Sequence, residues 1–114
     1  MKRGWRQIDR HAIFGTCYQG EVIIPYSELC KTFGAPERWE EPGDKIDAQW
    51  ILQSPRGHVV SIYNYKDGFN YLRKDGMSVE QIDTWHIGGK KKCIILEVYQ
   101  ALGMGLEFIL EEAL

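Results

Sequence analysis

Residues 45–66 read KIDAQWILQSPRGHVVSIYNYK, and this pattern predicts a β-hairpin at the centre of the fold. Over the first nine residues apolar and polar side chains alternate, so Trp50 and Leu52 share one face of a strand. The Ser-Pro-Arg-Gly sequence that follows suits a type I turn, because proline is favoured at its second position and glycine at its fourth. The remainder returns as a strand rich in β-branched and aromatic residues. We therefore expect Trp50 and Ile62 to face the core from paired strands.

Shorter elements surround this hairpin. Before it we expect a first hairpin over 12–24 that turns at Gln19-Gly20, then a helix over 26–33 capped by Ser27 and stopped by Gly34, and a loop over 35–44. After it we expect a loop with apolar anchors over 66–77 and a capping-box turn over 78–81, in which Ser78 bonds the amide of Gln81. A strand over 84–87 and a helix over 94–102 complete the expected elements. Hairpins outnumber crossovers, so we expect an α+β fold. It comprises one domain, residues 1–114, with an antiparallel sheet of about four to five strands and two main helices packed on one face.

The composition suits one soluble globular domain. Of the 114 residues 44% are hydrophobic and 26% charged, and the formal net charge is −2. This charge argues against a nucleic-acid binder that relies on bulk attraction. No run approaches the roughly 20 apolar residues that span a bilayer, and the first cations precede no apolar run of a signal peptide. We therefore expect a cytoplasmic protein without a membrane segment.

The cysteines argue against a disulfide framework. Cys17, Cys30 and Cys93 are odd in number and widely spaced among apolar neighbours, which predicts reduced and mostly buried thiols. No Cys-x-x-Cys or His-x-x-x-His spacing is present, so we expect no metal site and no cofactor. Cys93 has one alternative role, because a helix N-terminus behind three lysines would stabilise a reactive thiolate.

No catalytic constellation is apparent. His11, His58 and His86 each lie in or beside an expected strand, where a single histidine most often packs or faces solvent. The Gly-x-Ser-x-Gly signature of a serine nucleophile is missing. We therefore expect no catalytic residues and no enzymatic activity, with a small enzyme built around His86 as the remaining alternative.

Two clusters are candidates for binding. Residues 88–92, Gly-Gly-Lys-Lys-Lys, precede a helical pattern, and a helix start offers unpaired N–H groups and partial positive charge to an anion. The alternative is an exposed turn whose lysines pair with acidic side chains of residues 75–83. The second cluster joins Tyr63, Tyr65, Phe69, Tyr71 and Trp85 with Arg73 and Lys74. It suits base stacking, although aromatic residues in alternating strands also form cores.

Several short motifs resemble one group of proteins. The first motif has Gly20, Pro25-Tyr26, Leu29, Phe33-Gly34 and Pro36 at fixed spacing. The others are Lys45-Ile46-Asp47-Ala48-Gln49-Trp50, Ser61-Ile62-Tyr63-Asn64-Tyr65-Lys66 and Trp85-His86-Ile87-Gly88-Gly89. In this combination the chain resembles a group of small bacteriophage-encoded proteins over most of its length. The resemblance implies a viral accessory protein of the host cell cytoplasm. The order of helix, Phe-Gly-x-Pro and antiparallel strands is also similar to the β-lactamase-inhibitor-like domains, which are binding modules, and this likeness concerns fold layout.

We therefore expect a non-enzymatic accessory protein that binds and modulates or inhibits a host protein or complex, such as a bacterial defence system. The alternative is a nucleic-acid or nucleotide-binding protein that uses residues 88–92 and nearby aromatic side chains. Candidate binding residues are Trp39, Phe69, Tyr71, Arg73, Lys74, His86, Gly88, Gly89, Lys90, Lys91 and Lys92. The apolar C-terminal segment, residues 106–110, is a candidate helix for a homodimer contact.

Overall fold

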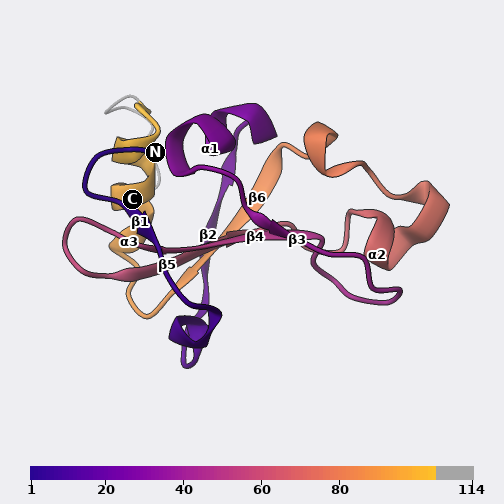
Figure 1. Cartoon of the computed structure of the whole chain (residues 1–114), viewed down its shortest axis with the longest axis horizontal. Coiled ribbons are helices and arrows are strands. Elements are labelled where there is room, and N and C mark those ends of the chain that lie inside the picture. The colour runs from indigo at the N-terminus through magenta and orange to yellow at the C-terminus, as the bar shows by residue number, and fades with distance from the viewer. Residues whose placement is uncertain (105–114) are drawn as a thin grey trace.

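An antiparallel sheet forms the frame of the protein, whose residues 1–104 are described by a computed structural model. The strands are β1 (Arg6–Gln7), β2 (Cys17–Ile23), β3 (Glu37–Arg38), β4 (Ala48–Gln53), β5 (Val59–Tyr63) and β6 (Thr84–Gly89). The helices are α1 (Tyr26–Phe33), α2 (Phe69–Leu72) and α3 (Ile94–Ala101), and three 3₁₀ turns are η1 (Arg10–Ile13), η2 (Arg73–Asp75) and η3 (Val79–Gln81). The strand order is β1-β4-β5-β6-β2, and β3 pairs with β4 beside this path (Figure 1). The predicted α+β fold class is confirmed.

The central hairpin has the predicted register. Strands β4 and β5 pair antiparallel with Trp50 opposite Ile62, and both side chains are buried. In the turn between them the Gly57 N–H donates to the Ser54 carbonyl over 2.8 Å. Gly57 adopts a φ of 85°, which glycine reaches without a steric cost. The turn residues and the apolar alternation therefore predict the same hairpin, and the structure contains it.

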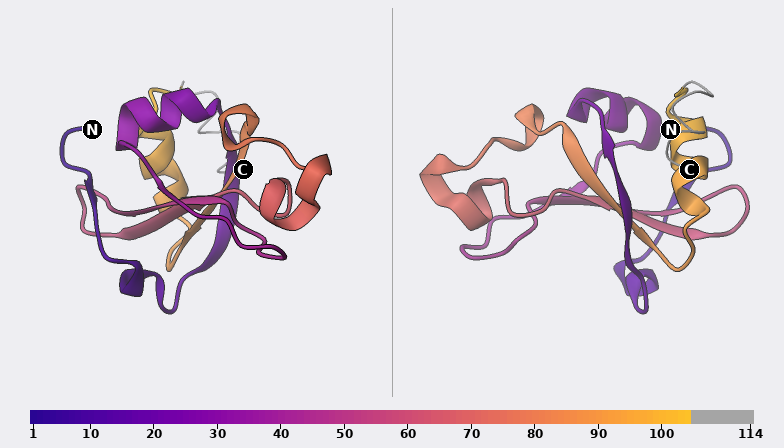
Figure 2. Two further views of the ribbon diagram at one scale, coloured as in Figure 1. Left: turned by 45° about the vertical axis from the view of Figure 1, so that its right-hand side comes forward. Right: turned by 180° about the vertical axis from the view of Figure 1, so that it is seen from behind.

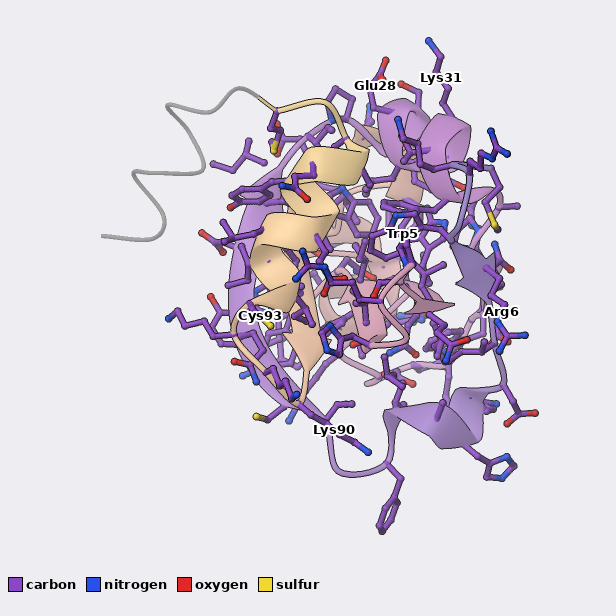
Figure 3. The ribbon with its side chains drawn as sticks, turned by 90° about the vertical axis from the view of Figure 1, so that its left-hand side faces the viewer. Trp5, Arg6, Glu28, Lys31, Lys90 and Cys93 are labelled. Carbon is purple, nitrogen blue, oxygen red and sulfur yellow. The ribbon has the colours of Figure 1, made fainter. Side chains whose placement is uncertain are left out.

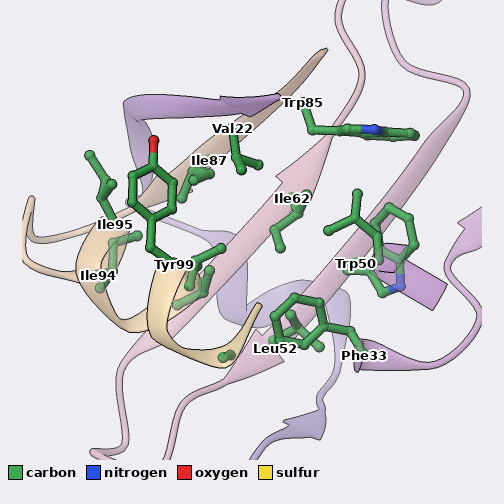
Figure 4. Close-up of a cluster of buried hydrophobic side chains, with 14 of the residues drawn as sticks. Val22, Phe33, Trp50, Leu52, Ile62, Trp85, Ile87, Ile94, Ile95 and Tyr99 are labelled. Atoms are coloured by element: carbon green, nitrogen blue, oxygen red, sulfur yellow. The ribbon is translucent and has the colours of Figure 1, made fainter. Parts of the chain in front are cut away.

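The core lies between the sheet and two helices on the same side of it. Both views in Figure 2 show α1 and α3 above the sheet. The buried side chains meet there from strands and helices alike; they include Val22, Leu29, Phe33, Trp50, Leu52, Ile62, Trp85, Ile87, Ile94, Ile95, Val98 and Tyr99 (Figure 4). The helical spacing of the apolar residues in α1 and α3 explains why each helix presents one face to this layer.

The opposite face of the sheet is partly covered. Turn η1 lies below the sheet in Figure 2, and the Ile8 N–H donates to the Ile51 carbonyl over 2.9 Å. Ile51 and Ser61 point away from the core helices yet are only 5% and 2% exposed. The N-terminal segment therefore covers one part of this face and leaves the part near β6 and β2 more accessible.

The predicted first hairpin is wrong. Residues 17–23 form one strand, β2, and residues 10–13 form η1. Gln19-Gly20 is locally suited to a turn, but the register shifts between Tyr18 and Gly20 instead. A Cβ on Gly20 would lie 2.7 Å from Cδ1 of Ile95, so the glycine allows the Ile95 side chain of α3 to approach the strand closely.

The helix over 26–33 and its stop at Gly34, which has a φ of 82°, are confirmed. The predicted cap of α1 is wrong, because Pro25 is its N-cap in place of Ser27. Ser78 is the N-cap of η3 but makes no side-chain cap bond, so the predicted capping box is wrong. In η3 the Gln81 N–H donates to the backbone carbonyl of Ser78 instead.

The two expected loops contain short elements. Strand β3 lies within 35–44, and α2 and η2 lie within 66–77. The apolar segment 106–110, expected to support a homodimer contact, lies outside the described residues. Within residues 1–104 no helix has the length and apolar character needed to cross a bilayer.

Candidate functional site

A cleft of about 650 Å³ lies between α2, the turns η2 and η3, and the chain around the end of β3. Figure 1 shows α2 at one end of the molecule. We call this hollow the loop cleft. Its lining residues are Arg38, Trp39, Glu40, Asp47, Phe69, Asn70, Arg73, Lys74, Ser78, Val79 and Glu80. Four predicted binding residues therefore meet in one hollow, Trp39, Phe69, Arg73 and Lys74. A concave site with convergent polar and aromatic groups is the usual form of a binding site.

A buried polar hub supports the loop cleft, and two of its three members, Asp47 and Asn70, line the cleft. Its members are Asp47, Asn64 and Asn70, whose exposed fractions are 5%, 0% and 1%. The Asp47 carboxylate accepts from Asn64 Nδ2 over 2.9 Å and from the Asn70 N–H over 3.0 Å. Asn64 Oδ1 in turn accepts the N–H groups of Asp47 and Ala48. Each of these buried polar groups thus has a partner, which is the condition for burying them at low cost.

Asn70 connects the hub to the segment that follows β3. Its Nδ2 donates to the carbonyls of Trp39 and Ile46, over 3.0 and 2.9 Å. Its Oδ1 accepts the Glu41 N–H over 2.9 Å. One amide side chain therefore ties α2 to the segment that follows β3, and residues of both line the cleft.

The aromatic side chains of the cleft differ in exposure. Phe69 is 48% exposed at the surface. Trp39 is half-buried, and its Nε1–H donates to Asp44 Oδ2 over 3.0 Å. The indole is therefore held in one orientation while part of its apolar surface remains accessible, as in a preformed anchor site.

Charges of both signs line the cleft. Arg38 and Glu80 form an ion pair with Nη1 and Oε1 2.6 Å apart. This hydrogen bond raises the pKa of Arg38 and lowers the pKa of Glu80. Arg73 is exposed and has a φ of 53°, uncommon for a residue with a side chain. Such strain persists only where surrounding structure enforces it, and it often occurs at functional sites.

Two of the other aromatic candidates, Tyr63 and Tyr65, lie on another surface. We call it the aromatic face and define it as Tyr18, Tyr63, Tyr65 and His86. It is on the side of the sheet opposite to α1 and α3. The three tyrosine rings lie 4.9, 5.5 and 5.1 Å from the imidazole centroid, and Tyr65 is stacked on it. Burial raises the pKa of Tyr63. The His86 side chain is half-buried and is surrounded by these three tyrosine rings.

Lys66 links the aromatic face to Tyr71. Its Nζ lies 5.3 Å from the ring centroid of Tyr65 and 5.6 Å from that of Tyr71. Trp85, grouped with these aromatics by composition, points to the other side of the sheet and is fully buried in the core. The alternation of β6 separates Trp85 from His86, so that part of the expected cluster is wrong.

Gly88 and Gly89 are buried in β6, and α3 begins later, at Ile94. A Cβ on Gly88 would lie 2.5 Å from the Ser61 Oγ, so the neighbouring strand leaves little room for a side chain here. The Gly89 carbonyl accepts from Gln19 Nε2 over 3.0 Å. The glycine pair therefore serves strand packing.

Lys90, Lys91 and Lys92 are exposed in the connection to α3, where Figure 3 labels Lys90. Within residues 1–104 none of these lysines forms an ion pair. The expected pairing with acidic residues of 75–83 is therefore wrong, since Glu80 pairs with Arg38 instead.

The cysteines are free thiols, but their expected burial is wrong for two of them. Cys17 and Cys93 are exposed, and Cys30 is half-buried. Cys17 begins the edge strand β2, and Cys93 is the N-cap of α3, so both lie at element ends that the apolar pattern does not cover. No disulfide joins them.

Asp47, Asn64 and Asn70 are the site residues that sequence reasoning missed. Asn64 offers a signal, because it is a polar residue between two tyrosines at the end of an apolar strand. A buried amide at such a position needs partners, which points to a polar network. Asn70 follows Phe69 in a composition typical of loops and offers no comparable signal. The sequence matches no protein-family model, and no curated protein matches it.

Proposed function

We propose that this protein is a non-enzymatic binding module that docks on another protein through the loop cleft and modulates or inhibits it. The resemblance to small bacteriophage proteins makes a host protein or complex the expected target. The observation that carries the proposal is the meeting of Trp39, Phe69, Arg73 and Lys74 in one preformed hollow of about 650 Å³. Aromatic and arginine side chains in pockets provide much of the binding energy of protein interfaces.

The charges of the cleft favour a protein partner over a phosphate backbone. The cations are Arg38, Arg73 and Lys74, and the carboxylates are Glu40, Asp47 and Glu80. Affinity for nucleic acid depends on neutralising phosphates with excess cations, and this lining has no excess. A protein surface with charges of both signs around an apolar side chain is the better match.

The polar hub supports docking through its rigidity. Asn70 joins both walls of the cleft through three side-chain hydrogen bonds. A cleft that is already ordered loses little conformational entropy when a partner binds, so more of the contact energy contributes to affinity.

The test is capture from bacterial lysate on the immobilised protein, followed by mass spectrometry, with cleft variants run in parallel. Phe69→Ala and Arg73→Glu remove the exposed aromatic and reverse a cation of the cleft. Tyr65→Ala is the matched control on the aromatic face. We expect one partner to be captured by the parent and by Tyr65→Ala, and to be lost with Phe69→Ala and with Arg73→Glu. Retention by both cleft variants would contradict the proposal.

The aromatic face supports a second candidate function, binding of single-stranded nucleic acid. Tyr65 and Tyr18 are 37% and 54% exposed around His86, and Lys66 lies beside them. Bases stack on such rings regardless of sequence. Lys90 belongs to the connection that follows β6 and would add a phosphate contact.

Salt dependence distinguishes the two candidates, because phosphate contacts weaken steeply with salt. Single-stranded oligonucleotides are titrated into the parent, Tyr65→Ala and the Lys90/Lys91/Lys92→Glu triple variant at low and moderate salt. Salt-sensitive binding that both variants lose would favour the nucleic-acid function. Absence of binding in the parent would leave protein docking as the better account.

A further inference from the structure

A second group of chemically competent side chains lies far from the loop cleft, where the turn between β4 and β5 meets the start of α3. Figure 1 shows α3 and α2 at opposite ends of the molecule. His58 follows the turn, Cys93 is the N-cap of α3, and Glu97 lies one helical turn further on. Residues four apart on a helix share a face, so Cys93 and Glu97 are neighbours.

The donor atoms of these three residues converge. One ring nitrogen of His58, the Cys93 Sγ and a carboxylate oxygen of Glu97 all lie within 4.8 Å of one another. The His58 Nδ1 is 2.7 Å from Glu97 Oε2. Ligands of a tetrahedral ion are about 3.3 to 3.8 Å apart when the bonds are about 2.0 to 2.3 Å long. Small side-chain rotations would therefore close the group around an ion.

A buried oxygen supplies an independent observation. The Glu97 side chain is only 11% exposed, and its Oε1 is buried with no hydrogen-bond partner among residues 1–104. A buried carboxylate oxygen without a partner is unfavourable, and native structures usually satisfy such groups. The His58 contact satisfies Oε2 alone, so the pair by itself does not account for Oε1.

We propose that His58, Cys93 and Glu97 bind a zinc ion. Nitrogen, thiolate sulfur and carboxylate oxygen are the ligands that Zn²⁺ takes in proteins, whereas Mg²⁺ and Ca²⁺ select oxygen alone. Binding displaces the thiol proton of Cys93, because the thiolate is the ligand. Three protein ligands leave a fourth position for water or another ligand. Cys93 is exposed, which gives the ion access from solvent (Figure 3).

The surroundings set a limit on affinity. Lys2, Arg3 and Arg56 line a hollow of about 220 Å³ that Glu97 also lines, and Lys91 and Lys92 directly precede Cys93. These positive side chains stabilise the Cys93 thiolate, but they also repel an incoming metal ion. We therefore expect zinc to bind weakly and to exchange. No short sequence motif marks the site, because His58 is distant in sequence from Cys93 and Glu97.

The chain contains a matched control. His11 Nδ1 lies 2.6 Å from Asp9 Oδ1, a histidine–carboxylate pair that is exposed. Cys17 is likewise exposed but is not part of the group. If substitution of His58 or Cys93 weakens metal binding and substitution of His11 or Cys17 does not, the binding is specific to the proposed site.

The first experiment adds cobalt to the reduced full chain and records the thiolate-to-cobalt charge-transfer band, then displaces cobalt with zinc. We expect the band in the parent, in Cys17→Ser and in His11→Gln. Cys93→Ser should abolish it, and His58→Gln and Glu97→Gln should weaken cobalt affinity by about tenfold or more. A band that survives Cys93→Ser, or unchanged affinity in His58→Gln, would overturn the proposal.

The second experiment uses the parent alone, so it does not depend on variants that fold. Alkylation of each cysteine is followed by peptide mass spectrometry with and without zinc. We expect zinc to slow labelling of Cys93 by about tenfold or more while Cys17 is unaffected. Equal labelling of Cys93 in both conditions would contradict a zinc site.

Discussion

The helix-covered sheet and the loop cleft are stabilised in different ways. The sheet region is held by apolar side chains such as Trp50, Ile62 and Trp85, which are at most 1% exposed. The cleft is held by the polar hub, in which Asp47, Asn64 and Asn70 satisfy one another and nearby backbone groups. Apolar contacts are many and individually weak, whereas each hub bond fixes one particular geometry. We conclude that the sheet region provides stability and that the hub provides the shape of the cleft.

The largest expected effect is in the sheet region. Trp50→Ala removes a buried indole and its hydrogen bond to the Gly34 carbonyl, 2.7 Å long. Unfolding free energy should fall by about 3 to 5 kcal/mol in denaturant titrations. Phe14→Ala is the control, because Phe14 is 88% exposed and its loss should change stability by less than about 0.5 kcal/mol. An unchanged midpoint for Trp50→Ala would contradict the position of Trp50 in the core.

The next effect is in the hub. Asn70→Ala removes three hydrogen bonds and leaves two carbonyls and one N–H without that partner. We expect a loss of about 2 to 4 kcal/mol, since stranded polar groups cost about 1 to 3 kcal/mol each and some gain water. Hydrogen exchange should accelerate most at Glu41, which loses its acceptor, and less in β5, which exchanges through global unfolding. Gln81→Ala, at an exposed position, should match the parent. Uniform acceleration across the sheet would contradict a separate role for the hub.

The sequence accounts for the sheet region better than for the cleft. Alternation and helical spacing depend on neighbours within one element, so the central hairpin, α1 and α3 follow from local patterns. The hairpin predicted over 12–24 is wrong because β2 pairs along its length with β6, a partner distant in sequence. The hub is also non-local: Asn64 and Asn70 bond to backbone groups more than ten residues away, and such pairings have no period. Composition identified several residues of the cleft as binding candidates, but only the fold brings them together in one hollow.

A smaller effect tests packing within the sheet. Gly88→Ala places a Cβ 2.5 Å from the Ser61 Oγ, and the expected loss is about 1 to 3 kcal/mol. Ser61→Ala removes that oxygen, so the double variant should regain part of the loss, measured by a double-mutant cycle. Strictly additive losses would show that the Ser61 hydroxyl is not the obstacle.

The smallest effect concerns Asp67, whose carboxylate accepts from the hub residue Asn64 over 3.0 Å. Burial raises the pKa of Asp67 above its ordinary 3.8. A raised carboxyl pKa means that the folded state holds the proton more tightly, so this contribution is full below the unfolded pKa and is lost as pH rises through the folded pKa.

Asp67→Asn should therefore stabilise the protein at neutral pH, by less than about 1 kcal/mol because the group is partly exposed. The gain should shrink below pH of about 4, where the parent carboxyl is protonated in both states. Melting curves at several pH values measure it. A gain that grows toward acid pH would reverse the sign and refute the role of burial.

The docking role of the cleft has a direct reporter in the indole of Trp39, which lines the cleft and donates its N–H to Asp44. Nuclear magnetic resonance resolves the indole N–H signals of the four tryptophans. When the captured partner is added, we expect the Trp39 signal to shift or broaden, while the signals of buried Trp50 and Trp85 stay in place. An unmoved Trp39 signal, accompanied by changes at Tyr65 and His86, would contradict docking at the loop cleft and assign the partner to the aromatic face.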